Sequence, residues 1–221
     1  MKKIGLVISG IGFENGTSVW DVAYALEEIE RCSGKPIPLV PRESIEKRIP
    51  GSRRKSSPER DFLKEAQHIV RGDVYYMNDV DPRDLDLLLI PGGEGCITVL
   101  SSLKRDGMDA QILPELRDLI IGMFVREKQI GTIGYGAALV AFVLRTKIQP
   151  IITVGDDAEM VELLKKMGSD IVKVQPHEVV FDPENHILST PGTSPKSSLY
   201  RAALGIEVLI TELLECKRKK L

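Results

Sequence analysis

The sequence of 221 residues predicts a single α/β domain, residues 1–221, with a mainly parallel sheet between two layers of helices. Short apolar runs, typical of strands buried on both faces, alternate with longer segments in which apolar residues recur at helical spacing. Several of the apolar runs end in glycine-rich turns, and no internal repeat or linker interrupts the alternation. This order of strand, turn and helix indicates crossover connections between parallel neighbours.

The first elements are two strands around one helix. Lys3–Ser9 is a short apolar run and predicts a buried strand. A helix follows, with Thr17 or Ser18 as its cap, and it closes at Gly34. The second predicted strand is Pro36–Val40.

The next stretch begins with residues 42–60, which are polar, basic and without periodicity. We expect an exposed excursion there, with a hairpin as one possible form. A helix at Glu59–Val70 and a short strand near Val74–Met77 follow. Leu85–Ile90 is the clearest buried strand of the chain, and Pro91–Gly93 ends it.

The central part of the chain predicts a helix, a strand and a buried helix in close succession. The first helix is around Leu113–Glu127, and the strand is Gln129–Ile133. The strand enters the sharp turn Gly134–Gly136, and Ala137–Leu144 is apolar on all sides. We therefore expect the helix after this turn to lie in the interior.

The last part repeats this order with a strand at Ile151–Val154 and a helix at Ala158–Met167. Val179–Phe181 and Ile187–Ser189 flank turn residues and predict a β-hairpin, and Ser197–Lys217 is the last long helix. The complete pattern is that of a flavodoxin-like, doubly wound fold, a three-layer α/β/α sandwich. Sites in such folds lie outside the carboxyl ends of the strands.

Four glycine-containing loops follow predicted strands: Gly10–Ser18, Gly92–Leu100, Gly134–Ala138 and Thr190–Ser194. Glycines let backbone N–H groups approach a ligand closely, although each glycine is also compatible with a simple tight turn. Together the loops predict a pocket. The candidate ligand-binding residues are Gly10, Gly12, Gly92, Gly93, Glu94 and Tyr135.

Composition narrows the partners of this pocket. A net charge of −2 and 5% aromatic residues do not favour binding to nucleic acid or to an anionic membrane, and no apolar run is long enough to span a bilayer. Cys32, Cys96 and Cys216 have unrelated spacings, so we expect neither a zinc site nor a disulfide framework. Free thiols favour a reducing compartment, and we expect a cytoplasmic protein.

Four segments resemble a known family: KKIGLVISGIGFENGTS, EAQHIVRGDV, DLDLLLIPGGEGCITVLSS and HILSTPG. Taken in order from about residue 2 to residue 210, the chain is similar to the isoprenoid-biosynthesis glyoxalases, also called enhancing-lycopene-biosynthesis proteins. This family lies in the PfpI-like (class I glutamine amidotransferase-like) superfamily. The resemblance implies the doubly wound fold, a homodimer, and chemistry on reactive carbonyls with no cofactor and no metal.

The reactive groups of that family are missing at the matching positions. Its cysteine nucleophile corresponds to Gly134, and its acidic partner corresponds to Ser18. The family's aromatic residue after the double glycine corresponds to Glu94, and its polar pair corresponds to Thr98 and Val99. A loop frame without its reactive groups is the profile of a pseudoenzyme.

Other residues could substitute for the lost groups. Cys96 follows the Gly92–Gly93 turn near a predicted helix N-terminus, where a thiolate is stabilised; the alternative is a small packed residue. Glu94 could contact a cationic group or act as a base, Glu14 could replace the acid or be a solvated loop residue, and Tyr135 could offer its hydroxyl or simply pack.

Two functions remain from these observations. The first is a non-catalytic or reassigned family member that binds a small ligand or a partner. The second is a cofactor-independent enzyme on reactive carbonyls, of glyoxalase or deglycase type, that uses Cys96 or Glu94. A class I amidotransferase would need a cysteine at Gly134, which the sequence lacks.

Overall fold

The computed structural model describes residues 1–12, 14–48 and 60–216. Within them, a seven-stranded sheet has the strand order β3-β2-β1-β4-β5-β9-β8. All neighbouring strands are parallel except β8, which pairs antiparallel with β9 at one edge. The strands are β1 (Lys3–Val7), β2 (Lys35–Val40), β3 (Tyr75–Tyr76), β4 (Leu87–Ile90), β5 (Ile130–Ile133), β8 (Val180–Asp182) and β9 (Ile187–Thr190).

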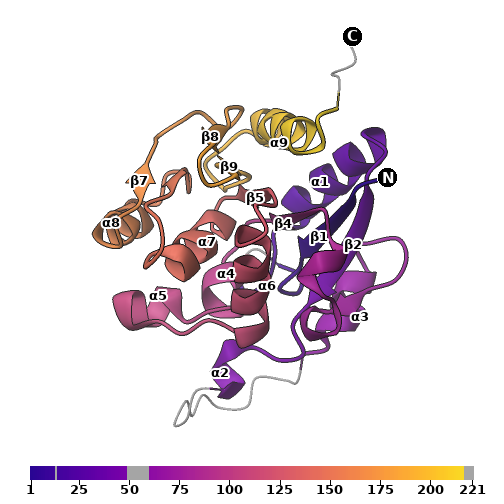
Figure 1. The fold of residues 1–221 in the computed structure, drawn as a ribbon, viewed down its shortest axis with the longest axis horizontal. Coiled ribbons are helices and arrows are strands. Elements are labelled where there is room, and N and C mark those ends of the chain that lie inside the picture. The colour runs from indigo at the N-terminus through magenta and orange to yellow at the C-terminus, as the bar shows by residue number, and fades with distance from the viewer. Residues whose placement is uncertain (13, 49–59, 217–221) are drawn as a thin grey trace.

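Helices cover both faces of this sheet, as Figure 1 shows. Helices α1 and α9 pack side by side on one face, whereas α6 and α7 lie on the other. The longer helices are α1 (Val19–Arg31), α6 (Pro114–Phe124), α7 (Gly136–Leu144), α8 (Ala158–Lys166) and α9 (Leu199–Leu214). The shorter ones are α2 (Ile45–Arg48), α3 (Phe62–Gln67), α4 (Gly95–Thr98) and α5 (Leu103–Asp106), with 3₁₀ turns at Met77–Asp79, Pro82–Asp84 and Gly107–Asp109.

The predicted three-layer α/β/α fold is therefore confirmed. Every residue of β4, β5 and β9 is buried, as expected of central strands covered on both faces. The apolar segment after β5 forms α7, in which only Val143 escapes full burial. The parallel order brings the carboxyl ends of β1, β4, β5 and β9 to one edge of the sheet, where the site is expected.

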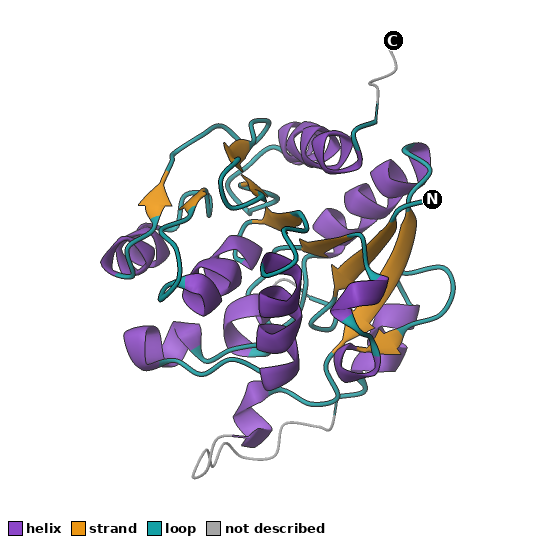
Figure 2. Cartoon of the chain, in the orientation of Figure 1, coloured by secondary structure: helices purple, strands orange, loops and turns teal. Residues whose placement is uncertain are grey.

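The segment Ile151–Val154 differs from the prediction. Its strand, β6 (Ile151–Ile152), does not join the main sheet but pairs with β7 (Asp170–Ile171) in a separate two-stranded sheet. Figure 2 shows this small sheet beside α8, away from the long central strands. Strand β9 pairs with β5 instead. The backbone N–H groups of Ile151 and Thr153 donate to side chains rather than to a neighbouring strand of the main sheet: Asp182 accepts from Ile151 and Ser189 from Thr153, each at 2.9 Å.

Other element boundaries are shorter than the periodicity predicts. The helix predicted at Glu59–Val70 is α3, with Glu59 outside the described residues, and the last helix ends at Leu214. The excursion 42–60 contains α2, and residues 49–59 of it lie outside the described residues. No helix among the described residues is long and apolar enough to cross a membrane.

The cysteine prediction is wrong for one pair. Cys32 ends α1 and forms a disulfide with Cys216, which follows α9, with 5.6 Å between their Cα atoms. The two residues are separated by 184 positions, so spacing does not reveal them as partners, whereas the packing of α1 against α9 brings them together. Beside the bond, Arg31 donates to Thr211 Oγ1 at 3.0 Å. The argument from free thiols to a reducing compartment loses its basis.

Candidate functional site

A cavity of about 710 Å³ opens at the carboxyl ends of β4, β5 and β9. Three of the four predicted loops line it, through Gly92 to Glu94, Gly134 to Tyr135 and Pro191 to Ser194. The segment from Val154 to Leu163, which includes the start of α8, closes another side. A pocket is thus present where the glycine loops predicted it.

The fourth loop does not contribute its glycines. Gly10 and Gly12, which we predicted to bind ligand, lie outside the lining of the cavity. The space beside Gly10 is filled by Arg60, where any Cβ would collide with the guanidinium group. Arg60 is paired with Glu65, whose carboxylate also accepts from the N–H of Ile11 at 2.9 Å.

Gly134 has the geometry of a strained elbow. Its φ of +50° lies in the left-handed region, which residues with a Cβ rarely adopt. A Cβ placed on it would lie 3.1 Å from the carbonyl oxygen of Pro191 and 3.8 Å from the Cα of Gly92. A side chain here would therefore be in tight contact with the Pro191 carbonyl group, and glycine leaves this part of the cavity lining without a reactive group.

The cavity lining also contains Asp21, a buried carboxyl group that the sequence analysis missed. Asp21 lies in the first turn of α1 and is only 1% exposed, yet it lines the cavity. Thr193 donates two hydrogen bonds to its Oδ1 atom, from the backbone N–H at 2.9 Å and from the hydroxyl at 2.7 Å. The signal was its spacing: Asp21 shares one helical stripe with the buried Ala25 and Ile29.

Burial dominates the electrostatics of Asp21. Loss of solvent raises its pKa to about 6, although hydrogen bonds from Thr193, the Gly92 N–H and Ser18 oppose the shift. Two glycines make room for the carboxyl group, since Cβ atoms at Gly92 and Gly192 would lie 2.6 and 3.3 Å from Asp21 Oδ2. The cavity floor therefore holds a carboxyl group that changes charge close to neutral pH.

Ser18, which matches the family's acidic position, has a different task. Its side chain caps α1 by accepting from the N–H of Asp21 at 3.3 Å. Its hydroxyl lies 2.7 Å from Thr193 Oγ1. Ser18 thus belongs to the buried network around Asp21, and the acidic group stands one helical turn further along α1.

Cys96 is turned away from the cavity. The residue is 1% exposed, it does not line the cavity, and its thiol donates to the carbonyl of Pro91 at 3.1 Å. Burial, with a smaller contribution from Asp21, raises the pKa of the Cys96 thiol far above its ordinary value. A protonated, buried thiol does not favour the nucleophile that we considered at this position.

The remaining candidates divide between the cavity and the surface. Glu94 lines the cavity but forms an ion pair with Lys104, and Glu14 is exposed outside it. Tyr135 also lines the cavity and donates to Asp157 Oδ2 at 2.5 Å. Burial and this hydrogen bond raise the pKa of Tyr135, so its hydroxyl stays protonated. Asp157 in turn caps α8 by accepting from the N–H of Met160.

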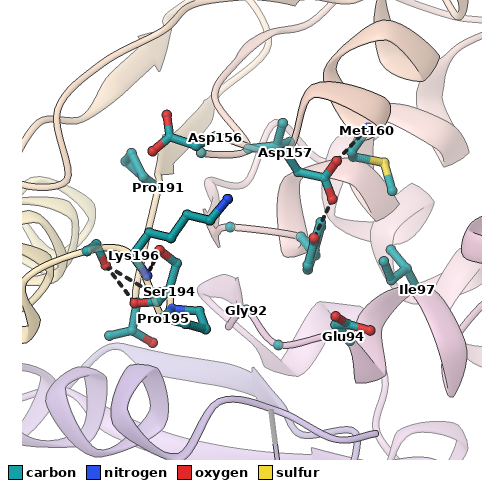
Figure 3. Close-up of a pocket in the computed structure, with 18 of the residues that line it drawn as sticks. Gly92, Glu94, Ile97, Asp156, Asp157, Met160, Pro191, Ser194, Pro195 and Lys196 are labelled. Atoms are coloured by element: carbon teal, nitrogen blue, oxygen red, sulfur yellow. Dashed lines mark hydrogen bonds between the residues drawn. The ribbon is translucent and has the colours of Figure 1, made fainter. Parts of the chain in front are cut away.

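Polar and apolar side chains both line the cavity (Figure 3). Ile97 and Met160 lie across the cavity from Ser194 and Lys196, with the carboxylates of Glu94 and Asp157 beside them. A mixed lining of this kind suits a small organic molecule that carries a polar group. Within the described residues, no group of three or more His, Cys, Asp or Glu is placed to hold a metal ion.

The doubly wound sheet with a left-handed elbow after β5 is the fold of DJ-1/PfpI-like proteins. Among solved structures, DJ-1beta of Drosophila melanogaster covers 97% of this chain and 91% of its own, with a TM-score of 0.62 and 14% identity, which shows the shared fold. No protein-family model matches the sequence.

Two further likenesses are narrower. An isoprenoid biosynthesis protein with an amidotransferase-like domain from Ehrlichia chaffeensis has a TM-score of 0.82 and 25% identity, covering 96% of this chain and 99% of its own. The mitochondrial ES1 protein of the zebrafish Danio rerio is 24% identical over 207 residues, 86% of this chain and 76% of the relative. The chain belongs to the PfpI-like superfamily, in the family of these isoprenoid biosynthesis proteins.

Proposed function

We propose that this protein binds a small organic ligand in the cavity above Gly134, and that it has lost the thiol chemistry of its superfamily. The observation that carries the proposal is the elbow itself: the left-handed turn lines the cavity, but Gly134 places no side chain in it. The cavity volume of about 710 Å³ lies within the usual range for small-molecule sites.

The thiol chemistry has no other residue to carry it. Cys96 is buried, protonated and absent from the cavity lining, and the other two cysteines are joined in the disulfide. A hemithioacetal with a reactive aldehyde therefore has no thiolate from which to form. We expect no production of lactate from methylglyoxal above the buffer rate, and the assay uses purified protein with Cys96→Ser as comparison.

An enzyme acting on reactive carbonyls is the second candidate, and Asp21 is the observation in its favour. A carboxyl group that titrates near neutral pH in a cavity suits general acid–base catalysis. Asp21 is better suited than Glu94, whose carboxylate is neutralised by Lys104. Methylglyoxal turnover that disappears in Asp21→Asn but survives in Cys96→Ser would favour this candidate.

We also propose that the protein forms a homodimer and is located in the cytoplasm. Trp20 and Tyr200 are 53% and 72% exposed near the N-termini of the neighbouring helices α1 and α9, which supports a contact between two copies there. Size-exclusion chromatography with light scattering tests the dimer, and Trp20→Lys should shift the elution towards the monomer.

Ligand binding is tested by titrating labelled protein with methylglyoxal and with lactate, while amide resonances are followed by NMR. We expect shifts at Gly92, Gly134 and Gly192, which surround the elbow. Ala158 lines the cavity at the start of α8, so Ala158→Trp should fill the space and abolish the shifts. Lys165→Trp, on an exposed position of the same helix, is the matched control and should bind as the wild type does. Shifts that persist in Ala158→Trp, or shifts confined to other regions, would contradict the proposal.

A further inference from the structure

The hydroxyl of Thr193 stands between two buried polar groups at the cavity floor. It lies 2.7 Å from Asp21 Oδ1 and 2.7 Å from Ser18 Oγ, and all three residues are at most 9% exposed. Thr193 also lines the cavity, as Asp21 does, whereas Ser18 lies behind them. The group therefore joins the interior of the protein to the space in which a ligand would bind.

The directions of these hydrogen bonds follow from the donors available. Thr193 donates its hydroxyl proton to Asp21, so Ser18 must donate to Thr193, while Ser18 accepts from the N–H of Asp21. One lone pair of Thr193 Oγ1 remains after these contacts. The Asp21 carboxyl group is held in turn by the N–H groups of Thr193 and Gly92.

A hydroxyl that donates to a carboxylate, which is itself held in place by a third group, has the arrangement of an activated nucleophile. We propose that Thr193 is a nucleophile for acyl transfer from small uncharged esters, with Asp21 as its general base. This proposal rests on the proposed function, because the ester must enter the same cavity.

The charges of the cavity favour an uncharged acyl group over a phosphate. The lining contains the carboxyl groups of Asp21, Glu94, Asp156, Asp157 and Glu159, but only the ammonium groups of Lys104 and Lys196. A phosphate dianion would meet an excess of negative charge there. A neutral ester avoids this repulsion, and its apolar part can contact Ile97 and Met160.

The reaction is balanced with water as the second substrate. Thr193 Oγ1 attacks the ester carbonyl carbon, its proton passes to the Asp21 carboxylate, and the carbon–oxygen bond to the alcohol breaks, leaving an acyl group on Thr193. The alcohol departs with the proton from Asp21. Water then attacks the acyl-threonine, gives a proton to Asp21, and releases the acid as the proton returns to Thr193 Oγ1.

The elbow after β5 lies beside the proposed nucleophile. Pro191 and Gly192, which directly precede Thr193, pack against Gly134 and Ile133. Helix α7 begins two residues after Gly134, but the N–H groups of Gly134, Ala137 and Ala138 already donate to backbone carbonyl groups and do not bind the oxyanion. The nucleophile would thus have moved from the turn after β5 to the loop after β9, next to the same helix end.

The state of Asp21 sets the pH dependence of the reaction. The titratable group that interacts with it is the Cys96 thiol, which remains protonated, and Ser18 and Thr193 contribute only hydroxyls. The charged groups on the cavity walls are Glu94 with Lys104, Asp157 with Tyr135, Asp156, Glu159 and Lys196. Because only ionised Asp21 can accept a proton, activity should rise with pH around 6.

The experiment is hydrolysis of p-nitrophenyl acetate, followed by release of p-nitrophenolate and by peptide mass spectrometry of the quenched protein. We expect one acetyl group on the peptide that contains Thr193. Thr193→Val should lower the rate about a hundredfold, the low end of what acid–base assistance contributes, and Asp21→Asn should remove the rise around pH 6. Thr193→Ser restores a hydroxyl at the same position and should retain activity. Thr211→Val, another buried Thr→Val change but on α9, should leave the rate unchanged.

Acetylation confined to lysines, absence of any adduct, or equal rates for Thr193→Val and wild type would overturn the assignment. Thr193→Ser keeps a hydroxyl at this position. If that variant folds but has no activity, the assignment of a nucleophilic hydroxyl is also contradicted. The NMR titration separates the two proposals. Shifts at the cavity glycines without acetylation reject only the nucleophile, whereas absence of binding rejects the proposed function as well.

Discussion

The two ends of α1 are joined to the same C-terminal region by different chemistry. At the N-terminal end, Ser18 and Asp21 form a buried hydrogen-bonded network with Thr193, in the loop before α9. At the C-terminal end, Cys32 is covalently bound to Cys216 after α9, with Arg31 donating to Thr211.

These two connections differ in what they do for stability. The disulfide limits the unfolded chain and stabilises the fold. The carboxyl group of Asp21 is removed from water, and its raised pKa means that its ionised form weakens the fold at neutral pH. A protein tends to keep an unfavourable buried charge where function requires it, so the contrast points to the N-terminal end of α1 as functional and to the C-terminal end as structural.

The largest effect is expected from breaking the disulfide. Cys32→Ser should lower the free energy of unfolding by about 2–5 kcal/mol, because the bond closes a long loop of the unfolded chain. The measurement is the denaturant midpoint with and without reductant. Cys96→Ser, which keeps a donor for Pro91, is the matched control and should respond to reductant as the wild type does. A wild-type denaturant midpoint that does not change with reductant would contradict the structural role of the disulfide at the C-terminal end of α1.

Removing the charge of Asp21, at the N-terminal end of α1, should stabilise the protein rather than destabilise it. The pKa of Asp21 is raised from 3.8 to about 6, so its contribution to stability is complete below about pH 4 and is lost as the pH rises through about 6. Asp21→Asn should therefore raise the free energy of unfolding at pH 8 by about 1–3 kcal/mol, reduced somewhat because the amide offers Gly92 a poorer partner. Its unfolding at pH 4 should differ little from that of the wild type.

Denaturant curves at both pH values measure this effect, with Glu14→Gln as an exposed control that should change neither. If the free energy of unfolding depends on pH equally in wild type and Asp21→Asn, the carboxyl group of Asp21 is not desolvated. The buried charge would then no longer indicate that this end of α1 is functional.

The smallest change in stability is expected from a substitution at Gly134, in the turn after β5. Gly134→Cys should lower stability by about 1–2 kcal/mol, because a Cβ is forced into the left-handed region at a φ of +50°. The introduced thiol faces the cavity, so iodoacetamide should label it much faster than Cys96. Adding Asp21→Asn should lower the pKa of the new thiol, since it removes a nearby negative charge. Labelling as slow as that of Cys96 would show that the turn is closed to the cavity.

Periodicity predicted the order of the elements because each strand and helix exposes its burial pattern locally. For this reason the turn at Gly134 is correct, and the strand predicted at Leu85–Ile90 is present as β4 (Leu87–Ile90). The strand predicted at Ile151–Val154 is an apolar run like the others, but its β6 pairs with β7 outside the main sheet, and β9 lies beside β5. Which strand pairs with which is a long-range choice, and a short apolar run contains no information about it.

Sequence alone determined the layered fold, the glycine turns and the absence of a nucleophile at Gly134, since these depend on residue type and local spacing. The tertiary structure decided which residues meet. In the sequence, Asp21 is simply an acidic residue near the start of a helix. In the folded protein, Thr193, which is 172 positions away, donates a hydrogen bond to it in the interior. Cys32 and Cys216 are unrelated in the sequence until α1 packs on α9. Desolvation and bonding between distant segments arise only when the chain folds, because both depend on contacts that no local pattern contains.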